Sequence, residues 1–125
     1  MTLLLLFNQS ETTGELPFLP SPRIVYIEYE NRGTMRNRWP VKDPDAILDY
    51  QSDWELWLGE DDTLASSTFD VPSGLTKESE SYTDTVATVW LSGGSPGTTY
   101  AITHTITTAA GRRDERTIKV RIAQR

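Results

Sequence analysis

The chain has 125 residues, a formal net charge of −6 and no cysteine, so it is long enough for one domain and has neither a disulfide nor a thiolate metal site. Residues 43–84 carry 12 acidic side chains and 1 basic one, whereas residues 85–125 carry 6 basic and 2 acidic side chains. The acidic block argues against a nucleic-acid groove, which needs a basic stripe, so no nucleic-acid partner is expected. Attraction between the two blocks, within the fold or between subunits, is one consequence, and solvated strand faces and loops are the alternative.

Residues 1–22 contain two short apolar runs, Leu3–Phe7 and Leu16–Leu19, set among polar residues. The first run is too short to cross a membrane and lacks the basic flank and cleavage site of a signal peptide. Three prolines after Leu16 exclude a helix and disfavour a central strand, so an extended arm is expected. Apolar side chains on such an arm need cover, either from the chain's own domain or, as we expect, from a neighbouring subunit.

The next segment contains a strand pattern at Ile24–Tyr29, followed by a turn at Asn31–Gly33. Residues 34–41 are basic and irregular, and they can add a strand to an edge of the domain or lend one to a partner. We therefore interpret residues 1–41 as an N-terminal arm with one strand at about 24–29. The side chains expected to contact other subunits are Leu3, Leu5, Phe7, Leu16, Phe18, Leu19, Val25, Ile27 and Tyr29.

From residue 42 onward, apolar runs and turn residues follow one another at the spacing of a β-sandwich. The run Leu48–Leu58 alternates between apolar and polar residues and predicts one long strand, although Ser52 and Trp57 interrupt the pattern. No stretch shows a helical period with caps, so no helix is expected. Further strands are expected at residues 64–71, 75–82 and 86–91.

Residues 87–122 form the most regular part of the pattern. Three runs rich in β-branched residues are separated by two clusters of turn residues, which indicates an antiparallel meander. The middle run alternates apolar and threonine side chains, as in a sheet that is packed on one side and solvated on the other. Trp90 and Tyr100 are expected in the core, and Gly111 is expected at positive φ in a hairpin turn.

The position of Tyr100, after a glycine-rich turn and at the start of a threonine-rich strand, resembles the closing hairpin of immunoglobulin-like sandwiches. Tyr100 then takes the place of the tyrosine corner. A β-meander with an exposed tyrosine is the alternative. The predicted fold is all-β: an immunoglobulin-like β-sandwich over residues 42–125 with an extended N-terminal arm.

No motif supports catalysis, a cofactor or a metal site. His104, the only histidine, lies on the apolar side of its strand, so a hydrogen-bonded, half-buried side chain is expected rather than a catalytic one. The carboxylate pairs Asp43/Asp45 and Asp61/Asp62 do not follow the ligand spacing of an EF-hand. Solvated turn acids are expected there, and whether a structural calcium is bound stays open.

Several short motifs occur in one order along residues 42–125. They are Lys42-Asp43-Pro44-Asp45, Leu48-Asp49-Tyr50, Asp53-Trp54, Trp57-Leu58, Val71-Pro72, Gly74-Leu75, Ala87 to Gly94, Gly97, Tyr100, Ile106-Thr107-Thr108, Gly111-Arg112 and Asp114 to Ile118. In order and spacing they resemble a small family of bacteriophage virion proteins, the phage fibre–tail adaptors. The resemblance runs from Lys42 to the end of the chain and does not cover the arm.

The resemblance implies a non-enzymatic virion protein, made in the cytoplasm of a bacterial host, that attaches tail fibres to the phage tail. Its partners would be other virion proteins (tail, fibre or capsid subunits), and several copies would form a symmetric assembly. No membrane partner is expected. A capsid decoration or cement protein with an immunoglobulin-like domain is an alternative, because fold alone does not determine function. A carbohydrate-binding module is another alternative, favoured by an exposed row of coplanar aromatic rings and opposed by burial of Trp54 and Trp90.

Overall fold

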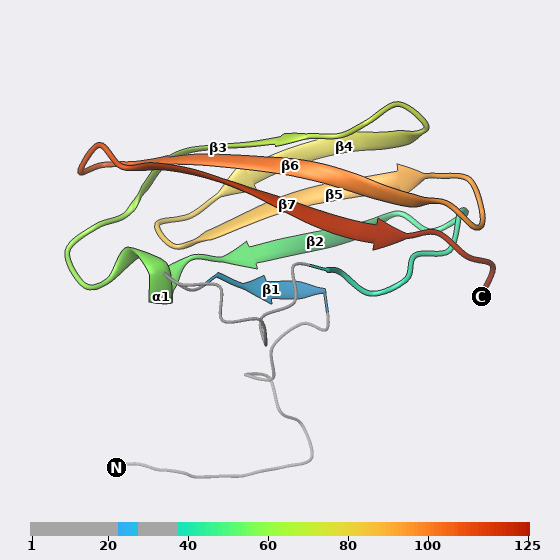
Figure 1. Ribbon diagram of the computed structural model, residues 1–125, viewed down its shortest axis with the longest axis horizontal. Helices are drawn as coiled ribbons and strands as arrows, with labels where there is room; N and C mark the ends of the chain where they lie inside the picture. The colour runs from blue at the N-terminus through green and yellow to red at the C-terminus, as the bar shows by residue number, and fades with distance from the viewer. Residues whose placement is uncertain (1–22, 28–37) are drawn as a thin grey trace, which may run out of the picture.

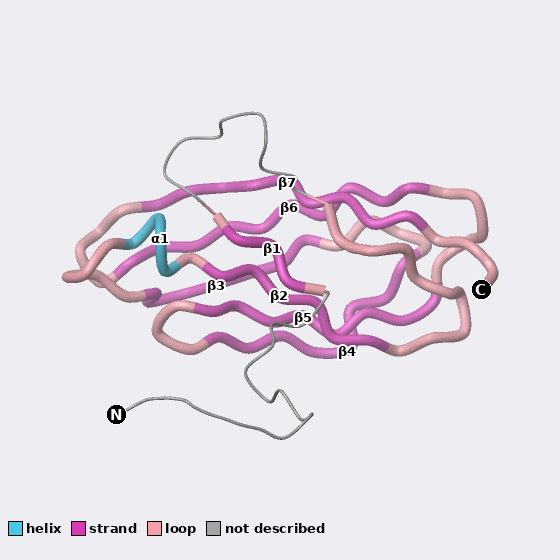
Figure 2. The backbone as a smooth tube through the Cα atoms, turned by 90° about the horizontal axis from the view of Figure 1, so that it is seen from below, coloured by secondary structure: helices cyan, strands magenta, loops and turns pink. Residues whose placement is uncertain are grey.

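The computed structural model describes residues 23–27 and 38–125, which contain seven strands and one short helix. Figures 1 and 2 show two layers of strands along the long axis, with α1 at one end and the C-terminus at the opposite end. Within these residues, no helix is long and apolar enough to span a membrane. The elements are β1 Ile24–Tyr26, β2 Leu48–Asp53, α1 Glu55–Leu58, β3 Leu64–Asp70, β4 Leu75–Tyr82, β5 Val86–Gly93, β6 Thr99–Thr108 and β7 Arg113–Arg121.

The strand order identifies the sandwich type. One sheet has the order β1-β2-β5-β4 and the other β3-β6-β7. This is the division of strands found in constant-type immunoglobulin domains, so the predicted fold class is confirmed. One pairing departs from that antiparallel pattern, since β1 runs parallel to β2 while the other strand pairs are antiparallel.

Tyr100 forms the tyrosine corner expected from the sequence. Its side chain is 8% exposed, and its hydroxyl accepts a hydrogen bond at 3.0 Å from the backbone amide of Ser95, five residues upstream. Gly74, with φ of +100°, packs against the ring, and a Cβ at this position would lie 3.0 Å from Tyr100 Oη. The corner therefore requires the tyrosine on one side and a residue without a side chain on the other.

A continuous row of aromatic rings, here called the aromatic row, lies between the two sheets. Phe69 of β3 stacks flat on His104 of β6, with ring centroids 3.9 Å apart. Neighbouring centroids in the rest of the row are 5.0 to 6.2 Å apart, a range in which aromatic pairs attract one another. Because rings from both sheets take part, the row joins the layers. Its members in order are Tyr50, Trp39, Phe69, His104, Trp54 and Trp57.

Residues 38–42 close one long side of the sandwich by running parallel to β7. The amide of Trp39 donates to the carbonyl of Lys119 at 2.9 Å, and its indole Nε1 donates to the carbonyl of Gln51 at 2.9 Å. Trp39 is only 1% exposed, so this residue belongs to the core of its own chain. The domain boundary expected at residue 42 stays a prediction.

Side chains of β4 close the opposite long side. Glu80 accepts a hydrogen bond from the amide of Phe69 at 2.9 Å, and Lys77 donates to the carbonyl of Phe69 at 3.0 Å. Tyr82 Oη donates to the carbonyl of Ala65 at 2.6 Å. These backbone groups of β3 face away from β6, and capping them removes a strand edge that could pair with another chain.

The prediction of one strand across Leu48–Leu58 is wrong in its second half, as is the expectation of no helix. β2 ends at Asp53, whose carboxylate accepts a hydrogen bond from the amide of Glu55 at 2.9 Å where α1 begins. The chain turns at Trp54, and Trp57 and Leu58 are then both buried. This turn explains why Trp57 broke the alternation in the sequence.

The expectation that Trp90 is a core residue is also wrong, because its side chain is 41% exposed. Its neighbours Val89 and Leu91 are fully buried. Successive side chains of a strand point to opposite faces, so Trp90 must point outward.

Truncation of the two tryptophans, Trp39 and Trp90, should therefore differ in its effect on stability. We expect Trp39→Ala to lower the free energy of unfolding by about 3–5 kcal/mol, as large aromatic truncations in cores do. Trp90→Ala should lower it by less than about 1 kcal/mol, as is usual for surface substitutions. Denaturant unfolding of both variants measures the difference, and the opposite order would contradict the described core.

Candidate functional site

Three connections meet at one end of the sandwich, here called the α1 end: residues 54–63, 83–85 and 109–112. Backbone hydrogen bonds join them, from the amide of Trp54 to the carbonyl of Thr85 at 2.8 Å and from the amide of Ala109 to the carbonyl of Thr63 at 2.9 Å. Residues 54–63 and 109–112 occupy the places of the B–C and F–G loops, which carry binding residues in immunoglobulin variable domains. The α1 end is therefore the candidate functional site of the described surface.

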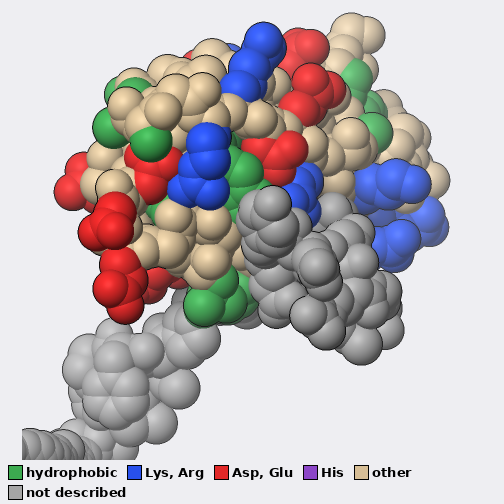
Figure 3. Space-filling view, turned by 60° about the vertical axis from the view of Figure 1, so that its left-hand side comes forward, with side chains coloured by type: hydrophobic (Ala, Val, Ile, Leu, Met, Phe, Trp, Pro, Cys, Tyr) green, Lys and Arg blue, Asp and Glu red, His purple; other side chains and the backbone are tan. Residues whose placement is uncertain are grey.

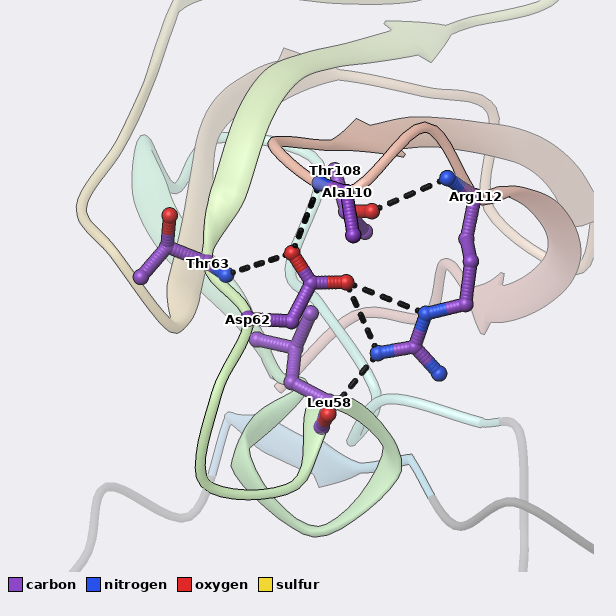
Figure 4. A network of polar contacts seen from close by, with 6 residues as sticks. All are labelled: Leu58, Asp62, Thr63, Thr108, Ala110 and Arg112. Atoms are coloured by element: carbon purple, nitrogen blue, oxygen red, sulfur yellow. Dashed lines mark hydrogen bonds and ion pairs between the residues drawn. The ribbon is translucent and has the colours of Figure 1, made fainter.

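Asp62 and Arg112 hold two of these connections together (Figure 4). Asp62 Oδ2 accepts hydrogen bonds from Arg112 Nε at 3.0 Å and Nη2 at 2.8 Å. Asp62 Oδ1 accepts from the backbone amides of Thr63 at 2.9 Å and Ala110 at 3.0 Å. Arg112 Nη2 also donates to the carbonyl of Leu58 at 2.7 Å, so this bidentate pair, here called the clamp, joins α1, the loop after it and the β6–β7 hairpin.

The turn at Gly111 gives Arg112 its position. Gly111 has φ of +96° and lies between β6 and β7, which confirms the predicted hairpin. The amide of Arg112 donates to Thr108 Oγ1 at 3.0 Å. The guanidinium carbon lies 4.4 Å from the ring centroid of Trp57, a cation–π contact. The clamp is thus stacked on the last ring of the aromatic row.

The donors around Asp62 determine its electrostatics. Burial raises the pKa of Asp62, but hydrogen bonds from Thr108, Arg112, Ala110 and Thr63 outweigh this and lower the pKa to about 2. The side chain is 6% exposed, and both oxygens accept from protein donors. The carboxylate is therefore ionised over the whole physiological range and is held by the fold.

The other candidate acidic pair also binds its own chain. Asp43 Oδ1 accepts a hydrogen bond from the amide of Asp45 at 2.8 Å, and Oδ2 accepts from the amide of Arg125 at 2.9 Å. In residues 23–27 and 38–125 there is no group of three or more potential metal ligands. Beside Asp43, Lys42 is fully buried, and its ammonium donates to the carbonyls of Asp43 and Gly93 at 2.9 and 2.8 Å.

The surface of the α1 end is acidic around the clamp. Figure 3 shows acidic side chains along one side of this face, with basic and apolar side chains beside them. Leu56, on α1, is 66% exposed. A shallow hollow here is lined by Glu55, Leu56, Gly59, Glu60, Asp62, Thr63, Asp84 and Thr85.

His104 lies in the core below the α1 end and is fully rather than half buried. Its Nδ1 is 3.1 Å from the carbonyl of Thr68, which can only accept, so Nδ1 carries the proton. Its Nε2 accepts from Trp54 Nε1 at 3.1 Å and lies 2.8 Å from Ser52 Oγ. Burial lowers the pKa of His104 to about 4, so a neutral imidazole joins the two sheets.

The side chains expected to contact other subunits fall into two groups. Val25 is 4% exposed and Ile27 is fully buried, and both belong to the core of their own chain. The remaining residues lie outside the part of the chain that the structure describes. Contact of all these side chains with another subunit stays a prediction. The residues outside the described part are Leu3, Leu5, Phe7, Leu16, Phe18, Leu19 and Tyr29.

The clamp was not predicted, because its two residues are separated by 50 positions in the sequence. A weaker signal was present in the charge distribution. Asp62 belongs to the acidic block and Arg112 to the basic block, whose attraction within the fold was one of the expected outcomes. Charge patterning indicates such attraction but does not identify the pair.

Comparison with known families gives one match, over residues 42–121, to the family described as Podophage GP4 fiber-tail adaptor protein gp77. The chain belongs to this family. Membership confirms the resemblance found in the sequence and indicates a structural role in a phage tail. The matched residues include the clamp, the tyrosine corner and most of the aromatic row, so the family model covers the sandwich.

Two solved structures are similar to this chain at a low level. The cysteine protease inhibitor EhICP2 from Entamoeba histolytica is 12% identical, with a TM-score of 0.46, over 80% of this chain and 93% of that one. The PKD domain from the KIAA 1837 protein is 21% identical, with a TM-score of 0.44, over 68% of this chain and 81% of that one. Similarity at this level carries no argument about function. No curated protein matches the sequence.

The clamp leads to a prediction with a matched control. Asp62→Asn should weaken the pairing with Arg112, lower the unfolding midpoint and speed amide hydrogen exchange at Ala110. Asp61→Asn, at the exposed neighbouring acid, should change neither. Because the pKa of Asp62 is lower in the folded chain, its carboxylate adds to the free energy of unfolding above the unfolded pKa of 3.8. This stabilisation is lost as pH falls through the folded pKa of about 2. Equal effects of the two substitutions at neutral pH would contradict the role of the clamp.

A second prediction concerns His104. Its folded pKa of about 4 lies below its unfolded value of 6.5, so the unfolded chain takes up the proton first as pH falls. The free energy of unfolding is therefore not reduced by His104 above pH 6.5. As pH falls from 6.5 to 4, it declines by about 3 kcal/mol. Denaturant unfolding at several pH values in this window should show the decline in the natural protein and not in His104→Phe. The same pH dependence in both proteins would rule out His104 as its source.

Proposed function

We propose that this protein is a non-enzymatic adaptor that attaches tail fibres to the tail of a phage. The observation that carries the proposal is the match to the podophage fiber-tail adaptor family over residues 42–121. Its partners are other virion proteins, several copies assemble symmetrically, and the protein acts in the virion tail.

The construction of the sandwich supports a mechanical role. Residues 38–42 close one long side against β7, and side chains of β4 close the other against β3. The clamp fixes the loops at the α1 end. A domain with capped edges and fixed loops keeps its shape under load and resists unspecific strand pairing, which suits a spacer between two larger bodies.

The N-terminal arm supplies the attachment in this proposal. Leu3, Leu5 and Phe7 are apolar residues at the far end of the arm, well separated in sequence from the described sandwich. Burying such side chains gains roughly 25 cal/mol per Å² of apolar surface removed from water. We propose that they insert into a neighbouring virion subunit, with the sandwich held at the distance that the rest of the arm allows.

The proposal predicts a separation of folding from assembly. Particles that lack this protein are supplied with purified natural protein or with a Leu3→Ser, Leu5→Ser, Phe7→Ser variant, and bound fibre protein is quantified. The variant should fold normally but restore little fibre attachment. A matched control, Thr103→Ser with Thr105→Ser on the outer face of β6, should restore it fully. Full fibre attachment on particles without the protein would contradict the adaptor role, and full activity of the arm variant would contradict the attachment by the arm.

Two other functions remain as alternatives. A capsid decoration protein would add shell stability instead of fibre attachment, and the same particles distinguish the two. A carbohydrate-binding module is opposed by the burial of Trp54, which is 0% exposed, but not by Trp90, which is exposed. Binding of free glycans by the purified chain, lost in Trp90→Ala, would favour that alternative.

A further inference from the structure

The outer faces of the two sheets differ in chemistry. The outward residues of β6 and β7 are mainly threonine and charged residues, such as Thr103, Thr105 and Lys119. The outer face of the four-stranded sheet instead carries two large exposed aromatic side chains, Trp90 at 41% and Tyr26 at 43% exposure. Among residues 23–27 and 38–125, the large exposed aromatic side chains on the outer sheet faces lie on this face, which makes it the better candidate of the two for a docking surface.

The strand register places these side chains on one surface. Tyr26 is in register with Asp53, which pairs with Val86, and the next outward row contains Ile24, Gln51 and Thr88. Trp90 is in the row after that, opposite Asp49. Ile24, Val86 and Thr88 are half-buried, and the half-buried outward residues of β2, Asp49, Gln51 and Asp53, lie between the strands that carry the two aromatic side chains. We call the surface formed by Ile24, Tyr26, Val86, Thr88 and Trp90 the Trp90 face.

The chain enters β1 beside this face. Arg23 Nε donates to the carbonyl of Asp49 at 2.8 Å, and Nη2 donates to Asp49 Oδ1 at 3.1 Å. The carbonyl of Arg23 accepts from the amide of Gln51 at 2.9 Å. Asp49 is the register partner of Trp90. Arg23 is therefore held on the strand next to Asp49, about two strand spacings, or roughly 10 Å, from the strand that carries Trp90.

The residues that precede Arg23 have the composition of a segment that binds aromatic surfaces. Leu16–Pro22 reads Leu-Pro-Phe-Leu-Pro-Ser-Pro and contains three prolines. Proline-rich chains adopt the polyproline II conformation with a rise of about 3.1 Å per residue, and they dock on aromatic-lined surfaces. Four such residues span roughly 12 Å, enough to reach Trp90 from Arg23.

We propose that Leu16–Pro22 docks on the Trp90 face of its own chain. Proline has no backbone N–H, so docking it on an apolar surface leaves no amide donor without a hydrogen bond. Phe18 and Leu19 would bury apolar surface in the same contact. The short tether to Arg23 raises the effective concentration of the segment far above that of a second molecule. The proposal goes beyond the adaptor role and differs, for Leu16, Phe18 and Leu19, from the expectation of contact with another subunit. It leaves Leu3–Phe7 as the part of the arm that reaches a partner.

Tryptophan fluorescence of the full chain tests the docking, because Trp90 is the one exposed tryptophan of four. The other three, Trp39, Trp54 and Trp57, are at most 8% exposed. Phe18→Ser with Leu19→Ser should move the emission to longer wavelength and increase quenching by acrylamide. Leu3→Ser with Leu5→Ser, a matched change elsewhere in the arm, should leave both unchanged. In a Trp90→Phe background the difference should disappear, and equal quenching of the natural chain and the Phe18/Leu19 variant would overturn the proposal.

Crosslinking tests whether the segment docks within one chain. Because the chain has no native cysteine, the introduced cysteines are the only thiols that can react. Leu19→Cys with Thr88→Cys, treated at low protein concentration with a short bismaleimide, should give a crosslinked monomer. Leu19→Cys with Thr103→Cys, on the opposite outer face, should give much less. Adding Trp90→Ser should slow the first reaction, which tethering alone would not do. Crosslinked dimers, or a reaction unaffected by Trp90→Ser, would overturn the proposal.

Discussion

The stacking of Phe69 on His104 is the contact on which the rest of the structure depends. It joins β3 and β6 at the centre of the core, with ring centroids 3.9 Å apart. The aromatic row continues from it in both directions, through Trp39 to the segment that closes one side and through Trp54 and Trp57 to the α1 end. The last ring of the row, Trp57, contacts the guanidinium of Arg112. The packing of the core therefore extends directly into the clamp that holds the loops of the α1 end.

The features that sequence reasoning predicted are those set by local patterns. Alternation along β6 placed His104 inward, and turn chemistry placed Gly111 at positive φ. Tyr100 was predicted because a tyrosine corner lies within a few residues of its own hydrogen-bond partner. Trp90 was expected in the core because it lies in one of the most regular strands. The regular alternation in fact points it outward, since its neighbours Val89 and Leu91 fill the inward face of β5.

Long-range features could not be predicted in the same way. Trp39 sits in an irregular segment and reaches the core only because that segment pairs with β7, near the other end of the chain. The one-turn helix α1 is too short for a helical period, and the shared parity of Leu56 and Leu58 also fits a strand. The Asp62–Arg112 clamp depends on the meeting of two loops that only the finished sandwich brings together.

The central claim is that a closed, stiff sandwich of the fiber-tail adaptor family works as a spacer in a phage tail. A cryo-electron microscopy reconstruction of the intact particle tests it most directly. The account predicts that density fitting the sandwich of β1 to β7 lies in the tail, in contact with tail subunits on one side and the base of a fibre on the other. Density for the same sandwich on the capsid shell, away from every fibre, would contradict it.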